Sequence, residues 1–437
     1  MAASIIPVQF LRLKSPVLDF SRILETAVQK FQDTAMTEEF PRLLVATEFP
    51  PNAAGGGGAI VRQMLQGWPV EKLSWWSCLP EGDRGFGQQV AAHRVAAAPD
   101  RLRPNRRLAR QKAWLMDTFW VPRATRHLRQ TLTELRPEVV WVIPHAWSIA
   151  PLARVLPGAG IGFHVSVHDY PDLKNQVDSL GGDRCDRWLK GLEQLYAHAT
   201  TRDAICQPMV DDLRRRTQAG GTVIRAGLEA KDFERLQTPV PADAGNPIRI
   251  AYAGTIHVPE VFAQFVAVLG KIRRQLPRPV RLDFFGNHSC RGFPWFDASW
   301  MTEHGNLPAQ PLNEALRKCT WGFSPMAMTD EDPSYNRFSF PTKFVSYLTA
   351  GLPVLSLGQP ASSILKMAAA YETGVCLTTV DETVLAGQLL AALNEPAPGA
   401  KYHPGLRRCA ETEFDGDRMR TTLHGFLKKS AFLSHPV

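Results

Sequence analysis

The sequence of residues 42–65 is RLLVATEFPPNAAGGGGAIVRQML. Its first part, residues 42–47, is a short apolar run that ends in a turn, which is typical of a buried strand in a parallel sheet. Four glycines, Gly55–Gly58, follow, and a helical pattern begins at Ala59. A strand, a glycine-rich loop and a helix in this order predict the first unit of a nucleotide-binding type of α/β domain.

Strands and helices alternate along the rest of the chain. Further strands are predicted at residues 139–143, 162–167, 222–224, 248–253, 280–285, 321–325 and 353–356. A turn-rich stretch, residues 238–247, has the composition of a linker. The pattern therefore predicts an α/β protein with two Rossmann-like, doubly wound parallel-sheet domains in series. We place the first domain at residues 37–237 and the second at 238–410.

The chain has 437 residues, of which 44% are hydrophobic and 21% charged, enough for two cores. Its formal net charge of +8 favours anionic partners without selecting one. The seven cysteines form no C-x-x-C pair, which favours reduced thiols over a disulfide framework or a zinc site. No apolar run approaches the roughly 18 residues that span a bilayer. Residues 1–36 lack a clear secretory signal and are expected to be an N-terminal extension outside the fold, with Met1 or Met36 as the native start.

Ligands of open α/β sheets bind beyond the carboxyl ends of the strands. The positions at these ends that we expect to approach a ligand are Gly56, Gly57, Gly58, Gly254, Thr255, Gly286 and Asn287. The glycine loop lacks the full dinucleotide spacing, because Val61 stands where a third glycine is needed, and no G-K-[S/T] ending marks a P-loop. A mobile glycine loop without a ligand is the alternative.

Two histidines stand at neighbouring strand ends. His168 is followed by Asp169, and His145 comes after the strand at 139–143. A histidine beside an acid can orient or deprotonate a hydroxyl group, so all three residues are candidate catalytic groups. A purely structural role for the histidines is the alternative.

The most specific stretch is FPTKFVSYLTAGLPV, residues 340–354. Pro341 suits the start of a helix and Gly351 its end. Thr342 and Lys343 then lie in the first turn, where a cation beside the helix N-terminus makes an anion site. Fixed positive charge there would stabilise a departing nucleoside diphosphate.

With these residues in view, the stretch from about Arg42 to Phe426 resembles the family-4 group of retaining GT-B glycosyltransferases. The matching landmarks, in chain order, are the first glycine loop (Phe49–Gly57), the strand PEVVWV (137–142), the strand-end histidine (167–169), the crossover segment VIRAGLE (223–229), the donor-side turn Ala253–Thr255, and the donor helix from Pro341 to Val354. Each landmark is weak alone, and their order and spacing carry the resemblance.

The resemblance implies that the second domain holds a nucleotide-diphosphate sugar, that the first holds the acceptor, and that the two face each other across a cleft. It also implies a C-terminal helix, within residues 411–437, that crosses back to the first domain. No cofactor and no metal are expected, because lysine, arginine and helix ends serve the diphosphate. Front-face displacement with retention, without a protein nucleophile, is the mechanism that the family implies.

The sequence departs from the family at the donor site. The family often has two glutamates where this chain has Phe338 and Ser346. We still expect Ser346 beside the nucleotide, and Arg225 to aid Lys343 as a phosphate cation. Residues 330–332, Asp-Glu-Asp, are either replacement carboxylates or a solvated acidic loop.

Residues 101–136 are markedly basic and carry Trp114, Phe119 and Trp120 among the arginines. This pattern suits a surface that contacts an anionic membrane. A helix pair with an aromatic core face and a solvated basic face is the alternative, and the interpretation that we prefer from the sequence. Nucleic-acid binding has no matching motif.

We expect a glycosyltransferase that moves a sugar from a nucleotide-diphosphate sugar to a hydroxyl of a glycan or a lipid-linked saccharide, in cell-surface polysaccharide synthesis. The expected location is cytoplasmic, with the inner membrane surface as an additional site. Three alternatives stay open: a nucleotide-sugar 2-epimerase of the same fold, a non-catalytic GT-B binding protein and, more remotely, a nicotinamide dehydrogenase.

Overall fold

The computed structural model describes residues 39–53, 56–80, 87–100, 108–171, 174–240, 247–287, 289–330 and 333–433. The expected extension 1–36 lies outside these ranges, as do Gly55, Glu331, Asp332 and residues 101–107 of the basic segment. Everything below concerns the described residues.

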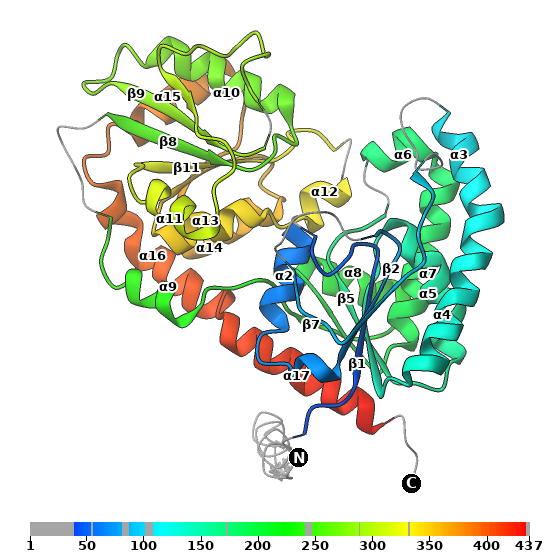
Figure 1. The fold of residues 1–437 in the computed structure, drawn as a ribbon. Helices are drawn as coiled ribbons and strands as arrows, with labels where there is room; N and C mark the ends of the chain where they lie inside the picture. The colour runs from blue at the N-terminus through cyan, green and yellow to red at the C-terminus, as the bar shows by residue number, and fades with distance from the viewer. Residues whose placement is uncertain are drawn as a thin grey trace, which may run out of the picture. The chain divides into compact units, whose positions relative to one another are not determined.

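The first half of the described chain is built on a seven-stranded parallel sheet with the order β3-β2-β1-β4-β5-β6-β7 (Figure 1). Two central strands, LLVAT and VVWVI, are buried along their whole length, as expected for a sheet covered on both faces. The strands are β1 (Leu43–Thr47), β2 (Leu73–Ser77), β3 (Ala92–Val95), β4 (Val139–Ile143), β5 (Phe163–Val167), β6 (Thr201–Ala204) and β7 (Thr222–Val223).

The second half holds a six-stranded parallel sheet with the order β10-β9-β8-β11-β12-β13. Its core is rich in aromatic side chains, and the rings of Phe265 and Phe323 stack at 3.7 Å between centroids. The strands are β8 (Ile248–Ala253), β9 (Val280–Phe285), β10 (Met301–Glu303), β11 (Trp321–Pro325), β12 (Val354–Leu357) and β13 (Gly374–Leu377).

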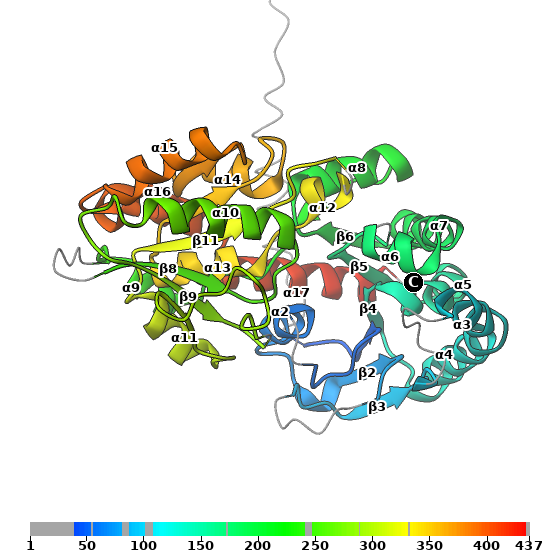
Figure 2. The same ribbon diagram turned by 90° about the horizontal axis from the view of Figure 1, so that it is seen from above.

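Helices connect the strands and cover the sheets. In Figure 2, α4, α5 and α7 lie on one side of the first sheet, while α2 and α17 lie on the other. The bounds are α2 (Gly56–Met64), α3 (Ala109–Leu115), a π-helical turn η3 (Met116–Trp120), α4 (Val121–Leu135), α5 (Ile149–Val155), α6 (Lys174–Leu180), α7 (Gly182–His198), α8 (Gln207–Thr217), α9 (Ala230–Arg235), α10 (Pro259–Ile272), α11 (Ala309–Leu316), α12 (Pro333–Phe338), α13 (Thr342–Ala350), α14 (Ser363–Tyr371), α15 (Glu382–Leu393), α16 (Pro398–Glu413) and α17 (Gly416–Phe432).

The strand order reverses at the same place in both sheets. In each, the first strand of the half lies in the middle, beside the fourth, so that the switch points lie between β1 and β4 and between β8 and β11. At a switch point, the connections that follow two neighbouring strands run in opposite directions and leave a crevice between them. Open α/β sheets bind their ligands in this crevice. The prediction of two doubly wound parallel sheets is confirmed.

The last helix, α17, packs against α2, β4, β5 and β6 of the first half. The Ser430 hydroxyl hydrogen-bonds with that of Thr201 at 2.8 Å, and the His424 ring nitrogen Nε2 lies 2.8 Å from the Met64 carbonyl oxygen. The C-terminal segment thus returns from the second half and joins the first, where hydrogen bonds from His424 and Ser430 hold it.

The two connections between the halves cross at Gly227. The Leu228 amide donates to the Phe414 carbonyl at 2.7 Å, and the Gly416 amide donates to the Leu228 carbonyl at 3.0 Å. A Cβ atom on Gly227 would lie 2.5 Å from the Phe414 oxygen and 2.6 Å from the Gly416 nitrogen. Both neighbours are backbone atoms, so the crossing requires glycine.

Replacing Gly227 by alanine is expected to destabilise the protein by about 1–3 kcal/mol, because the backbone at Phe414 and Gly416 must move apart. The free energy of unfolding from urea titration measures this. Gly387→Ala is the control, since Gly387 lies in α15 with no atom near the added methyl group, and alanine there should be neutral or stabilising. Equal stability of the two variants would contradict the tight crossing.

Candidate active site

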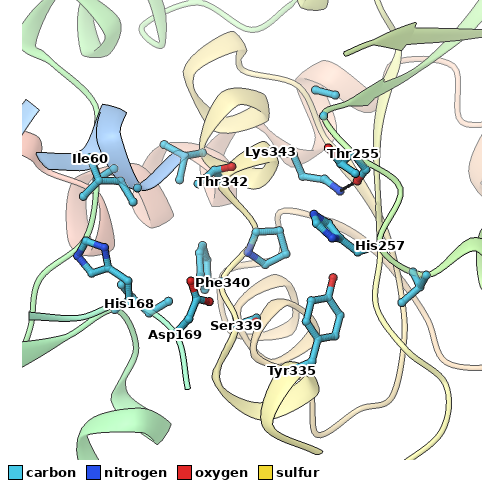
Figure 3. Close-up of a pocket in the computed structure, with 18 of the residues that line it drawn as sticks. Ile60, His168, Asp169, Thr255, His257, Tyr335, Ser339, Phe340, Thr342 and Lys343 are labelled. Carbon is cyan, nitrogen blue, oxygen red and sulfur yellow. Dashed lines mark hydrogen bonds between the residues drawn. The ribbon is translucent and has the colours of Figure 1, made fainter. Parts of the chain in front are cut away.

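A cavity of about 860 Å³ lies among the strand ends of both sheets. Its wall includes Gly57 and Ile60 of α2, the residues after β5, and the turn after β8. In Figure 3, His168 and Asp169 face it from the first half, across from Lys343 and Thr255 of the second half. Segments that follow strands of both sheets therefore contribute to one cavity.

Most of the residues selected from the sequence line this cavity. They are Gly57, His168, Asp169, Arg225, Gly254, Thr255, Asn287, Thr342 and Lys343. Gly58, His145, Gly286 and Ser346 are absent from its wall, and Gly56 is not among the residues whose side-chain surroundings the structure describes. The chemistry that the cavity offers is best understood from the buried charges among the lining residues.

The strongest feature is the ammonium group of Lys343. The side chain is 8% exposed, and Nζ donates to the Tyr252 hydroxyl at 2.9 Å and to the Thr255 carbonyl at 3.5 Å. It also lies 4.4 Å from the centre of the Tyr252 ring, a cation–π contact. Burial lowers the pKa of Lys343 from 10.5 to about 8. Among the described residues, no carboxylate pairs with this ammonium group.

The position of Lys343 follows from local sequence. Pro341 precedes the helix with extended backbone, and Gly351 ends it with a left-handed φ of 68°. Lys343 therefore falls in the first turn of this nine-residue helix, beside amides that have no partner within the helix. An ammonium group and a helix N-terminus at one cavity wall form a site for an anion.

Arg225 adds a second buried cation. It is 6% exposed, and its guanidinium group lies 5.1 Å from the ring centres of both Phe340 and Phe414. One nitrogen, Nη2, lies 3.3 Å from Glu413 Oε2, whereas Nε and Nη1 have no hydrogen-bond partner among the described residues. Burial lowers the pKa of Arg225, although arginine stays protonated. The field of this cation reinforces that of Lys343 within the cavity.

The backbone after β8 and β9 requires glycine at Gly254 and Gly286. Gly254 has φ of 95°, in the left-handed region that favours glycine. A Cβ atom on Gly286 would lie 2.8 Å from the Gly254 carbonyl oxygen. Gly286 therefore packs behind the Gly254 turn and shapes the wall. At Gly58, a Cβ atom would lie 2.5 Å from the Ala53 carbonyl oxygen, so a larger residue would be too close to the backbone there as well.

The first half contributes His168 and Asp169, which follow β5 directly. Burial lowers the pKa of His168, which favours a neutral ring, and burial raises the pKa of the Asp169 carboxyl group. A neutral imidazole and a carboxylate with raised basicity can both accept a proton from a hydroxyl group. This side of the cavity is therefore suited to an alcohol acceptor.

His145 follows β4, at the switch point of the first sheet, near enough for its charge to act on His168 and Asp169. Its Nδ1 lies 2.6 Å from Glu48 Oε2, at the end of β1. Burial would lower the pKa of His145, but the hydrogen bond to Glu48 and the Glu48 charge outweigh burial and raise it. Glu48 was not predicted from the sequence, although it directly follows β1, at the kind of strand end where α/β sheets bind ligands.

Phe338 stands where the family-4 pattern would have its first glutamate. Its ring lies 4.8 Å from that of Tyr170, and its carbonyl oxygen accepts from the Cys206 thiol at 3.3 Å. Phe338 thus joins α12 to the first half instead of facing the cavity. Ser346, where that pattern would have its second glutamate, lies one turn beyond Lys343 and is half-buried.

Other residues of the wall were not among the predicted site residues. His257, Glu260 and Tyr335 line the second-half side, and the rings of His257 and Tyr335 lie 6.3 Å apart. Asp330 is described, whereas Glu331 and Asp332 lie outside the described ranges. Across the described residues, no group of three histidine, cysteine or acidic side chains is arranged to hold a metal ion.

Neither a protein-family model nor a curated protein sequence matches this chain. Solved structures do match. The sucrose-phosphate synthase of Thermosynechococcus elongatus has a TM-score of 0.63 and 14% identity over 87% of this chain and 97% of that one. The E. coli trehalose-6-phosphate protein bound with UDP-2-fluoro glucose gives 0.60 and 13%, over 89% and 99%.

A third match is the UDP-forming α,α-trehalose-phosphate synthase of Burkholderia xenovorans in complex with glucose-6-phosphate. Its TM-score is 0.57 at 13% identity, over 87% of this chain and all of that one. Likeness over nearly the whole of each chain confirms the predicted GT-B fold. At this identity the likeness shows the fold alone, and membership of family 4 stays a prediction.

The unpaired charge of Lys343 has a consequence for stability. Replacing Lys343 by methionine is expected to raise the free energy of unfolding of the ligand-free protein by about 1 kcal/mol or more, since a desolvated charge is removed and the volume is kept. Urea unfolding measures this, with Lys318→Met, an exposed lysine of the loop after α11, as the matched control.

The pH dependence of the free energy of unfolding tests the desolvated charge of Lys343 independently. The pKa of Lys343 is lower in the folded protein than in the unfolded chain, so the unfolded chain binds more protons between about pH 8 and 10.5. The contribution of Lys343 to the free energy of unfolding of wild type should therefore increase as the pH rises through that interval. Lys343→Met should lack this gain. A methionine variant less stable than wild type at pH 7 would show that the contacts with Tyr252 and Thr255 outweigh the desolvation.

Proposed function

We propose that this protein is a glycosyltransferase that uses a nucleotide-diphosphate sugar as donor. The single observation that carries the proposal is the buried Lys343 ammonium group at the N-terminus of α13, which no carboxylate neutralises among the described residues. A desolvated cation without a counter-ion is costly unless a ligand supplies the negative charge. A diphosphate fits, because it is anionic and also accepts hydrogen bonds from helix amides.

The two sides of the cavity would divide the reaction between them. Lys343 and the first turn of α13 would hold the diphosphate and stabilise the negative charge that develops as it leaves. His168 and Asp169 would contact the acceptor hydroxyl or the donor sugar, and His145, paired with Glu48, would act on them through its charge. Arg225, fixed between Phe340 and Phe414, would add positive potential without touching the leaving group directly.

The neighbours in fold support this assignment by analogy. One of them is bound with UDP-2-fluoro glucose, and a trehalose-6-phosphate synthase of the same fold carries out glycosyl transfer with retention. We extend the nucleotide-sugar donor and retention to this chain as part of the proposal. A glycan or lipid-linked hydroxyl as acceptor, a role in polysaccharide synthesis, and independence from metal ions belong to the proposal too.

Nucleoside diphosphates should bind wild type, and Lys343→Ala should weaken binding by roughly 10- to 100-fold, the usual range for a charge-assisted hydrogen bond. Wild-type affinity should also fall as the pH rises through about 8, because free Lys343 loses its proton there. Lys343→Ala should lack that fall. Isothermal titration with UDP, GDP and ADP measures both effects, and Lys318→Ala is the control.

Transfer itself is tested by incubating each nucleotide sugar with and without acceptors and following products by NMR. We expect donor consumption that depends on acceptor, retained anomeric configuration, and unchanged rates after EDTA treatment. Asp169→Asn should lower kcat by about 10²-fold or more while leaving nucleotide affinity unchanged. Conversion of the donor alone into an epimer would indicate an epimerase instead. Nucleotide binding without any conversion would indicate a binding protein.

A further inference from the structure

Exposed apolar side chains gather on one surface of the first half. Leu108, Trp114 and Phe119 are 57%, 59% and 63% exposed, so three of the large hydrophobic residues that the described chain leaves exposed lie within one short stretch. Trp120, the third aromatic residue of the stretch, is buried, and its indole nitrogen donates to the Ala96 and Ala97 carbonyls. The preferred sequence interpretation, an aromatic core face, therefore holds for Trp120 alone among the three aromatics.

A π-helical turn places the two exposed rings together. In an α-helix, which advances about 100° per residue, residues five apart lie roughly 140° from each other around the axis. The turn η3 between α3 and α4 is wider, with i→i+5 hydrogen bonding, and it rotates Phe119 toward the face of Trp114. Their rings meet edge to face at 6.4 Å between centroids. A wide turn with no glycine or proline within it aligns these rings toward solvent.

Arginines flank the aromatic pair on the same face. Arg110 lies four residues before Trp114, and Arg123 lies four residues after Phe119, spacings that share one side of a helix. Arg110, Arg123 and the neighbouring Arg126 are all exposed, and no described carboxylate forms an ion pair with them. The one acid between residues 108 and 133, Asp117, instead binds Arg184 at 2.8 Å.

We propose that this face, the aromatic–arginine stripe of Arg110, Trp114, Phe119, Arg123 and Arg126, docks onto an anionic phospholipid bilayer. Trp and Phe side chains settle at the boundary between headgroups and acyl chains, and arginines reach lipid phosphates from there. The charges argue against a second copy of the chain as the occupant, because self-association would bring unpaired arginines together. The proposal does not depend on the proposed transferase activity.

One helix separates the aromatic–arginine stripe from the candidate active site. Helix α3 contacts α6, and Asp178 of α6 lines the cavity. A bilayer on this face would therefore lie beside the first-half rim of the cavity. If the proposed function holds, this geometry favours an acceptor that carries a lipid anchor, delivered from the bilayer to His168 and Asp169.

Vesicle co-sedimentation of the full chain tests the docking. We expect wild type to bind vesicles of phosphatidylcholine with phosphatidylglycerol, and to bind pure phosphatidylcholine at least ten-fold more weakly. Arg110→Ala with Arg123→Ala should lose roughly ten-fold or more in partitioning to the anionic vesicles, given about five-fold per arginine near the surface. Trp114→Ser with Phe119→Ser should lose a similar factor. The controls are Phe293→Ser and Arg274→Ala, exposed residues of the second half.

A fluorescent readout fixes the depth of insertion. Lipids brominated in the acyl chains should quench part of the tryptophan emission of wild type, and Trp114→Phe should bind equally well but lose that quenched part. All variants should keep the wild-type melting temperature, since the changed side chains lie in solvent. Equal vesicle binding by wild type and both stripe variants would overturn the proposal. Dimers in solution that Trp114→Ser with Phe119→Ser dissociates would also overturn it, by showing that a second copy covers the face.

Discussion

The buried ammonium group of Lys343 is the constraint around which the cavity is organised. Its carbon chain is fixed by the first turn of α13, and its charge rests against the Tyr252 ring and hydroxyl. Tyr252 belongs to β8, the strand beside the switch point, so the cation lies where the second sheet opens. With no carboxylate beside it in the described chain, the folded protein keeps an unbalanced positive charge that a diphosphate would balance.

The opposite wall has the complementary character. His168 and Asp169 line it after β5, and the pair of His145 and Glu48 lies at the switch point of the first sheet, outside the wall; these groups can hold or pass a proton. Two features hold the two walls at their relative position. One is the crossing at Gly227, where both connections between the halves meet, and the other is α17, which ties the end of the chain to the first sheet. The aromatic–arginine stripe lies on the first half as well, so the proposed acceptor site and the proposed bilayer contact share one half.

Sequence periodicity predicted the strands well where apolar residues dominate them. The strands at 139–143, 248–253 and 280–285 begin and end at the predicted residues, and Pro341 and Gly351 flank α13 as their backbone preferences require. Strand β6, Thr-Arg-Asp-Ala, was missed because its polar residues serve the core: Asp203 meets His164 at 2.6 Å inside the sheet. Phe338 and the π turn at η3 were also beyond prediction, since each is defined by a partner distant in sequence or by an irregular turn.

The most direct test is a crystal structure of the chain with a bound nucleotide sugar or nucleoside diphosphate. The account predicts a phosphate oxygen within hydrogen-bond distance of Lys343 Nζ and of the first amides of α13, with the sugar directed toward His168 and Asp169. A nucleotide bound elsewhere, with Lys343 still resting on Tyr252 and Thr255 and the cavity empty of anions, would contradict it.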